Sequence, residues 1–144
     1  MNADFPIVKM PGHLIRRLHQ QSTAVFQERV RAAGIEITSV QFAALSALAQ
    51  WPGIDQATLA GMVAYDRATI GGVVARLVDR GLVVRWTDAD DRRARKLRLT
   101  EEGAALLNRL TPLVTELQPQ ILGSLTEEEA AQLVRLMQKS LSLE

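Results

Sequence analysis

Three arginines stand close together in the middle of the chain, at Arg92, Arg93 and Arg95. A guanidinium group is permanently charged and carries a planar fork of donors, which suits it to phosphate and to a narrow, electronegative minor groove of DNA. Residues 65–98 carry nine Lys/Arg and five Asp/Glu, a net charge of +4, whereas residues 101–144 carry three and seven, a net charge of −4. This asymmetry predicts a face that binds a polyanion, and nucleic acid is the obvious one.

The arginine cluster lies in a loop between two segments that alternate with a period of two. Residues 83–87 and 95–100 both show this pattern, which predicts two strands joined as a hairpin with the arginines near its tip. Aspartates in the same loop dilute the charge, and we expect them to orient a neighbouring arginine by ion pairing. A loop that is merely solvated is the alternative. Lys96 and Arg98 are either phosphate contacts or solvent-facing strand residues.

A helix is predicted immediately before the hairpin, over about residues 67–80. Asp66 is suited to cap its start, and Gly81 stands where a left-handed residue ends many helices. Its apolar side chains recur at helical spacing and hold it to a core: Ile70, Val73, Val74, Leu77 and Val78. The opposite face presents the candidate DNA-reading residues: Arg67, Thr69, Gly72 and Arg76.

Gly71 and Gly72 are unusual inside this helix, because each costs about 1 kcal/mol relative to alanine. A close approach of another backbone, from DNA or from a packed helix, would account for them. The plainer alternative is that Arg67 and Arg76 only solvate a surface helix.

Further helices are predicted on both sides of this unit. One covers about residues 12–33, a second follows the capping box formed by Thr38 and Gln41, and a short third follows Asp55. The order is helix, helix, short helix, capped helix and basic hairpin, which is typical of a winged helix-turn-helix. In such a unit the N-terminal half of the capped helix enters the major groove of DNA.

The C-terminal third is predicted to hold two helices. Thr100 caps the first, which has apolar residues at helical spacing through position 121; Thr126 and Glu129 form a capping box for the second. Pro112 and Pro119 lie within the first pattern and are expected to kink or interrupt it. The apolar stripes at residues 106–121 and 130–141 are wider than a small domain needs, so they call for a partner. The fold class is mainly α with a small β-hairpin wing (α+β).

Several function classes are excluded by what the sequence lacks. With no cysteine, the chain has no disulfide, thiolate metal site or thiol redox sensor. It has no membrane-length apolar segment and no signal-peptide pattern, so we expect a cytoplasmic protein. It also lacks a Walker-type phosphate loop and a G-x-S-x-G elbow, so an enzyme is not expected. His13 and His19 are six apart, on different faces of a helix, so neither a metal site nor a cofactor is expected.

The segments DRATIGGVVARLVDRGLVVR, DDRRARKLRLTEEG and LTEEEAAQLVRLM resemble the MarR family of bacterial regulators, from about residue 10 to residue 142. The arginine-bearing loop followed by L-T-x-x-G is the more specific part. The resemblance implies three regions: an N-terminal dimerisation helix at 1–37, a winged helix-turn-helix DNA-binding domain at 38–100, and C-terminal dimerisation helices at 101–144. It also implies that Arg93 probes the minor groove, and that the dimer binds a pseudo-palindromic operator with half-sites about one helical turn apart.

The segment PGHLIRRLHQ is similar to family members that control the breakdown of aromatic acids. By this resemblance His13, Arg16 and Arg17 are candidates for binding a small aromatic carboxylate or phenol. Arginine binds carboxylate bidentately, and histidine can bond a ring hydroxyl. The alternative is a helix start with exposed basic side chains and no ligand. Phe42 and Trp51 are expected to pack in the core rather than to line a pocket.

Together these features predict a homodimeric DNA-binding transcriptional repressor that a small aromatic acid or phenolic ligand releases from its operator. The alternative is a ligand-independent architectural protein that binds DNA without regard to sequence. Both would use basic wings and phosphate contacts, but only the repressor would protect one short palindromic site far more strongly than random DNA.

Overall fold

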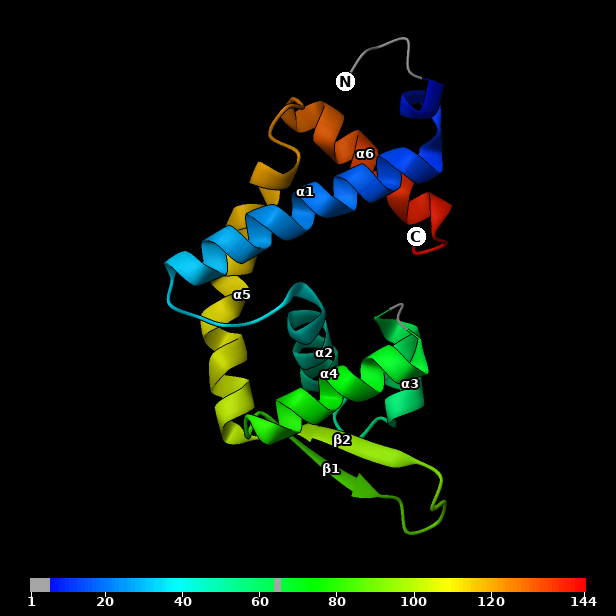
Figure 1. Cartoon of the computed structure of the whole chain (residues 1–144), viewed down its shortest axis with the longest axis vertical. Helices are drawn as coiled ribbons and strands as arrows, with labels where there is room; N and C mark the ends of the chain where they lie inside the picture. The colour runs from blue at the N-terminus through cyan, green and yellow to red at the C-terminus, as the bar shows by residue number, and fades with distance from the viewer. Residues whose placement is uncertain (1–5, 64–65) are drawn as a thin grey trace. The chain divides into compact units, whose positions relative to one another are not determined.

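The computed structural model describes residues 6–63 and 66–144. Its elements, in chain order, are η1 (Pro6–Lys9), α1 (Pro11–Ala32), α2 (Ser39–Gln50), α3 (Gln56–Met62), α4 (Arg67–Asp79), β1 (Val83–Thr87), β2 (Arg95–Leu99), α5 (Glu101–Ile121) and α6 (Glu127–Ser140). Figure 1 shows them along the chain. The predicted class, mainly helical with one small hairpin, is confirmed.

The chain divides into two compact units. The winged unit spans Phe26–Val114, and the terminal unit combines the chain up to Val25 with Thr115–Glu144. In the winged unit, α2, α3 and α4 pack on one another and on the hairpin (Figure 1). Its core is fully buried and almost entirely aliphatic: Leu45, Leu48, Leu59, Ile70, Val74, Leu77, Val83 and Leu97. Burying such side chains is the main source of this unit's stability.

The two aromatic residues at α2, Phe42 within it and Trp51 at its end, differ in how far they are buried. Phe42 is half-buried and its ring lies 6.2 Å from that of Phe26, in a tilted arrangement. Trp51 is 45% exposed, so the expectation that it packs in the core is wrong. It stands at the C-cap of α2, where the chain turns away toward Pro52 and Gly53.

The wing has a third extended segment besides its two strands. β1 and β2 pair antiparallel, from Val83 opposite Leu99 to Thr87 opposite Arg95. On the free side of β2, the N–H of Gly53 donates to the Leu97 carbonyl at 2.8 Å, and the N–H of Leu97 donates to the Ile54 carbonyl at 3.0 Å. The connection between α2 and α3 therefore satisfies the edge of the hairpin, which would otherwise leave backbone groups unpaired.

The L-T-x-x-G segment closes the hairpin against the end of α4. The hydroxyl of Thr100 donates to the Gly81 carbonyl at 2.6 Å, and its N–H donates to the Leu82 carbonyl at 3.1 Å. A Cβ at Gly103 would overlap that Leu82 carbonyl oxygen. Glycine at 103 thus lets the first turn of α5 lie against the backbone of Leu82. Gly81 has φ of +73°, the left-handed conformation expected from its position after α4.

All the predicted helix caps are present. Thr38 and Gln41 form a capping box at α2, and Thr126 and Glu129 form another at α6. Asp55 caps α3 and Asp66 caps α4, each accepting from the backbone N–H three residues later, at 2.7 and 2.8 Å. The carboxylate of Glu129 accepts from the N–H of Thr126, and this bond lowers the pKa of Glu129.

The prolines do not interrupt the long C-terminal helix, so that half of the expectation is wrong, while the expected kink stays a prediction. α5 runs from Glu101 to Ile121 through both Pro112 and Pro119. Proline removes one N–H and one carbonyl partner each time, which a well-anchored helix tolerates when other groups compensate. Leu110 and Leu117, on the buried face of the same helix, are both 0% exposed.

The terminal unit combines the first part of α1 with the end of α5 and with α6. The side-chain amide of Gln21 donates to the Ile121 carbonyl at 2.6 Å, joining α1 to the end of α5. α6 has no buried residue although Val134, Leu136, Met137 and others recur on it. Among the residues that the structure describes, no helix combines the length and apolar character needed to cross a membrane.

Candidate nucleic-acid interface

The outward face of α4 carries the four residues predicted to read DNA. Arg67, Thr69, Gly72 and Arg76 are all exposed, while Ile70 and Leu77 on the opposite face are 0% exposed. Asp66 holds the start of this helix, and its bonds to the backbone N–H and hydroxyl of Thr69 lower the pKa of the Asp66 carboxyl. The helix therefore presents a fixed, hydrogen-bonded first turn on its exposed side.

The two adjacent glycines of α4 have different surroundings. A Cβ at Gly71 would lie 3.5 Å from the side-chain nitrogen of Gln56, in ordinary contact. A Cβ at Gly72 would meet nothing within 4 Å, so nothing inside the described protein requires glycine there. Because glycine costs stability in a helix, contacts within the described residues do not account for glycine at this position.

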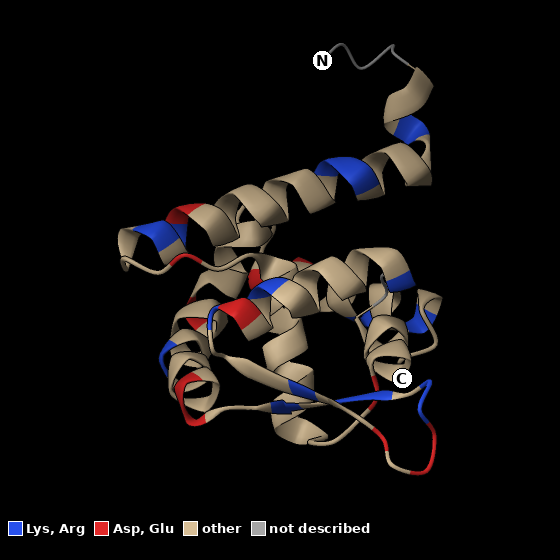
Figure 2. Cartoon of the chain, turned by 60° about the horizontal axis from the view of Figure 1, so that its bottom comes forward, with Lys and Arg blue, Asp and Glu red and all other residues tan. Residues whose placement is uncertain are grey.

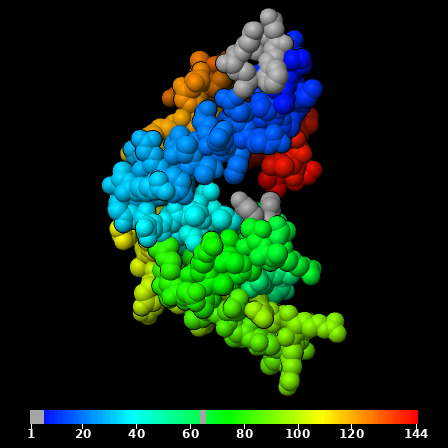
Figure 3. Space-filling view, in the orientation of Figure 1, coloured from blue at the N-terminus to red at the C-terminus, as the bar shows by residue number. Residues whose placement is uncertain are grey.

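The wing loop is ordered by its own carboxylates. Asp91 accepts from the backbone N–H of Arg93 at 3.0 Å, and Asp88 accepts from that of Asp90 at 3.1 Å. Asp88 also forms an ion pair with Lys96 at 3.9 Å, and its own N–H donates to the Ala94 carbonyl. Asp91 thus orients Arg93 through the main chain rather than through its guanidinium. The loop projects from the winged unit (Figure 3) and carries acidic and basic residues side by side (Figure 2).

Lys96 and Arg98 lie on the solvent-facing side of the wing. They pair in register with Trp86 and Val84, which are 42% and 37% exposed. The guanidinium of Arg98 lies 5.8 Å from the centroid of the Trp86 ring, within the range of a cation–π contact. This contact holds the Arg98 side chain along the strand, toward the loop end of the hairpin.

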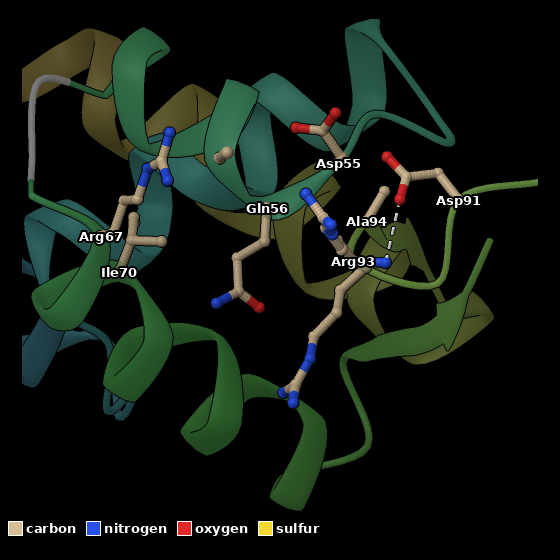
Figure 4. Close-up of a pocket in the computed structure, with 9 residues that line it drawn as sticks. Asp55, Gln56, Arg67, Ile70, Asp91, Arg93 and Ala94 are labelled. Atoms are coloured by element: carbon tan, nitrogen blue, oxygen red, sulfur yellow. Dashed lines mark hydrogen bonds between the residues drawn. The ribbon is translucent and has the colours of Figure 1, made fainter.

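A hollow of about 350 Å³ opens between the start of α4 and the wing, and three of the predicted DNA-binding arginines line it: Arg67, Arg93 and Arg95. Figure 4 shows the arrangement. The other four candidates, Thr69, Gly72, Arg76 and Arg92, are exposed but do not line this hollow.

Two lining residues were not among the sequence-derived candidates. Gln56 lies between Arg67 and Arg93 in Figure 4, and Asp55 also lines the hollow. The pKa of Asp55 is lowered, first by the hydrogen bonds from Thr58 and also by the nearby charges of Lys96 and Arg67. The capping pattern had marked Asp55 as a helix start, but no sequence signal placed either residue beside the arginines.

Of the three candidate ligand residues of α1, Arg17 alone lines the hollow described next. Arg17 lines a hollow of about 680 Å³ with Leu14, Gln21 and Leu133, whereas His13 and Arg16 do not line it. Both ring nitrogens of His13 are shielded from solvent, and no partner for them occurs in the described part of the chain. A second hollow of about 370 Å³ is lined mostly by apolar side chains and by His19, Ser22 and Gln118. Within residues 6–63 and 66–144, no group of three His, Asp or Glu side chains is placed to hold a metal ion.

Comparison with known proteins decides the family. Residues 37–94 match the MarR family. Over 138 residues the chain is 38% identical to the HTH-type transcriptional repressor NicR of Pseudomonas putida, covering 96% of this chain and 86% of NicR. The chain belongs to the MarR family. It is therefore a transcriptional regulator and not an enzyme, and the predicted resemblance is confirmed.

Solved structures of MarR-family regulators match nearly the whole chain. PcaV of Streptomyces coelicolor, in complex with its natural ligand, superposes with a TM-score of 0.85 at 37% identity, covering 99% of this chain and 98% of PcaV. BpsR of Bordetella bronchiseptica, whose DNA binding is regulated by 6-hydroxynicotinic acid, gives 0.84 at 29% identity over the full length of both. A mutant of MarR from Escherichia coli complexed with operator DNA gives 0.82 at 28%, covering 96% of this chain and 99% of MarR.

Proposed function

We propose that this MarR-family protein is a repressor that binds its operator with α4 in the major groove and the wing tip in the adjacent minor groove. The observation that carries this proposal is the hollow in which Arg67 of α4 and Arg93 and Arg95 of the wing meet. Arginines from the two elements thereby face one side of the winged unit, as binding across neighbouring grooves of one duplex requires. Such a regulator works in the cytoplasm, where bacterial DNA is found.

Each candidate has a role suited to its position. Arg67, Thr69 and Arg76 reach base edges or phosphates from α4, and the open face at Gly72 admits the DNA backbone. Arg93 enters the minor groove at the wing tip, with Arg92 and Arg95 beside it on the flanking phosphates. Similarity to MarR solved with operator DNA supports this mode of binding.

The experiment is to select binding sites from a random DNA library with the purified protein and to footprint the strongest. A repressor of this kind enriches a short motif with two-fold symmetry, with half-sites about one helical turn apart, and binds it about 10³-fold or more tightly than random duplex at fixed salt. Enrichment of no motif, with equal affinity for all duplexes, would instead identify an architectural protein that binds DNA without regard to sequence.

We further propose that the protein is a homodimer, formed by the N-terminal region 1–37 and the C-terminal region 101–144 around the DNA-binding region 38–100. Large apolar side chains of the terminal unit are left exposed in the single chain, among them Ile15 at 66%, Leu141 at 68% and Val134 at 43%. Exposed apolar groups gathered on α1 and α6 mark a surface that a second copy would cover.

Sedimentation equilibrium tests the dimer. Ile15→Glu and Leu141→Glu each place a charge on the proposed interface, so both should shift the protein toward monomer and weaken operator binding. Val84→Glu is the matched control for the sedimentation measurement alone, because Val84 is an exposed apolar residue of the wing, 37% exposed, outside the proposed dimer interface; it should stay dimeric. A monomeric wild-type protein at micromolar concentration would contradict the proposal.

The proposed effector is a small aromatic carboxylate or phenol, bound near His13, Arg16 and Arg17. The shielded imidazole of His13 without a partner is costly as it stands, and a ligand hydroxyl would satisfy it. Arg17 lines a neighbouring hollow, and an arginine can bind a carboxylate through two hydrogen bonds. Similarity to BpsR, which 6-hydroxynicotinic acid regulates, supports the choice of ligand class.

Thermal-shift measurements with hydroxylated aromatic acids, including 6-hydroxynicotinate, followed by competition against operator DNA, test the effector. A true effector raises the melting temperature and weakens operator binding with a coupling of about 1–3 kcal/mol. His13→Ala, Arg16→Ala and Arg17→Ala should reduce the shift, whereas Arg31→Ala, further along α1, should not. If no such compound stabilises the protein or releases DNA, the effector proposal is wrong.

A further inference from the structure

We infer that Asp55 and Gln56, at the start of α3, form a brace that fixes the wing relative to α4, and that they are positioning residues for operator binding. The inference rests on the proposed function, because it assumes that α4 and the wing contact the same duplex. Neither residue needs to touch DNA itself. The brace would set how far Arg93 reaches into the minor groove when Arg67 is bound in the major groove.

The backbone before α3 is attached directly to the wing. The N–H of Gly53 donates to the Leu97 carbonyl at 2.8 Å, and the N–H of Leu97 donates to the Ile54 carbonyl at 3.0 Å. Asp55 and Lys96 are paired in an isolated antiparallel β-bridge of the backbone. A displacement of α3 would therefore move β2 with it. Main-chain atoms make this attachment, so side-chain substitutions at Asp55 and Gln56 leave it in place. The substitutions therefore test only what the two side chains add.

The carboxylate of Asp55 links three elements. It caps α3 by accepting from the Thr58 N–H at 2.7 Å, and it lies within electrostatic range of Lys96 on β2 and Arg67 on α4. One negative charge thus attracts a cation from each of the two DNA-contacting elements. Of these two cations, Arg67 lines the same hollow as Asp55, so the attraction favours an Arg67 side chain that stays beside the wing.

Gln56 spans the hollow from the wing to α4. Its side-chain oxygen accepts from the guanidinium of Arg85 on β1 at 3.5 Å, a long hydrogen bond. Its side-chain nitrogen faces Gly71 of α4, where an added Cβ would already be in van der Waals contact at 3.5 Å. Figure 4 shows its carboxamide between Arg67 and Arg93. The Gln56 side chain therefore lies between β1 and α4, close to both.

The spacing of α4 and the wing matters because neighbouring grooves of a duplex lie at fixed separation. A wing that is free to tilt loses orientational entropy on binding, whereas a braced wing has already lost it. The brace should consequently contribute to affinity for the operator, where both elements engage, more than to non-specific binding, which relies on phosphate contacts alone.

A double-mutant cycle on the full-length protein tests the brace, with operator affinity measured for wild type, Gln56→Ala, Arg93→Ala and the double variant. Gln56→Ala should weaken operator binding about fivefold, and the double variant should lose clearly less than the product of the two single losses. Gln50→Ala, an exposed glutamine at the end of α2, is the control and should change nothing. Unfolding curves should superpose for wild type and Gln56→Ala.

Asp55→Ser provides a second test, because serine can still cap α3 while removing the charge. It should also couple with Arg93→Ala while leaving stability near that of wild type. Removing a negative charge from a DNA-facing surface would by itself raise affinity for random duplex and operator alike, so the ratio of the two affinities is the quantity to compare. The brace predicts that this ratio falls.

The outcomes separate the brace from the proposed function. Independent losses from Gln56→Ala and Arg93→Ala, or no loss from Gln56→Ala, would overturn the brace while leaving the operator-binding mode intact. No loss from Arg93→Ala alone would overturn the role of the wing, and the brace would fall with it. If Gln56→Ala unfolds the protein, Gln56→Met, which keeps the length of the side chain but not its oxygen, takes its place in the cycle.

Discussion

The carboxylate of Asp66 binds Thr69 twice, accepting from its backbone N–H and from its hydroxyl, each at 2.8 Å. The first bond caps α4, and the second fixes the rotamer of a side chain that faces the proposed DNA surface. Because the Thr69 hydroxyl donates its proton to Asp66, it faces outward as an acceptor. In this state it suits a base amino group better than a phosphate, which offers only acceptors.

Acid should destabilise the fold through this carboxylate. The pKa of Asp66 is lowered below its ordinary value of 3.8, first by the backbone bond from Thr69, so the folded protein releases this proton more readily than the unfolded chain. Its stabilising contribution is full above pH 3.8 and is lost as pH falls through the lower, folded pKa. Unfolding curves between pH 6 and about 2.5 should show a smaller loss for Asp66→Asn, which still caps the helix without titrating. An identical pH profile for the two proteins would contradict this.

Gly72→Ala should separate folding from function. Nothing within 4 Å would meet the added Cβ, so alanine should stabilise α4 by about 1 kcal/mol. If the DNA backbone approaches this face, the same methyl group should weaken operator binding. Gly61→Ala in α3 is the control, since its Cβ also meets nothing and it should stabilise without affecting DNA. Equal operator affinity for the two variants would show that Gly72 lies away from DNA.

Gly103→Ala should have the opposite effect on stability. Its Cβ would overlap the Leu82 carbonyl oxygen, a backbone atom that already accepts from the Thr100 N–H. Relief requires α5 to move away from the end of α4, and we expect a loss of about 1–3 kcal/mol, typical of overpacking. Chemical denaturation measures it. A variant as stable as wild type would mean that this contact is not close in solution.

Local features of the fold were predictable from the sequence because their causes lie within a few residues. Thr38 with Gln41, and Thr126 with Glu129, cap helices through atoms three residues apart. The period-two alternation around the arginines likewise identified the hairpin. These patterns need no knowledge of distant parts of the chain.

Features that depend on tertiary neighbours were harder to predict. Pro112 and Pro119 break helices in isolation, yet α5 continues through both with Leu110 and Leu117 buried along it. Gln56 carries no sequence signal, because its importance comes from Arg85, Arg67 and Arg93, which the fold brings to it. The spacing of residues along the sequence does not show that these four side chains lie close together in the fold.

The wing aspartates were only partly understood from the sequence. They were expected to orient arginines by ion pairing, but Asp91 instead bonds the backbone N–H of Arg93, and Asp88 pairs with Lys96. In a tight turn the nearest donors to an aspartate are the N–H groups two residues on, and those bonds form first.

The central claim is that α4 and the wing read DNA together, and the affinity of Arg93→Ala for the selected operator tests it most directly. Fluorescence anisotropy at fixed salt should show a loss of about 1–3 kcal/mol relative to wild type, with binding to random duplex much less affected. Arg109→Ala, which removes an exposed arginine of α5 that is not among the proposed DNA-contacting residues, should remain dimeric and bind the operator as wild type does. Unchanged operator affinity for Arg93→Ala would contradict the claim.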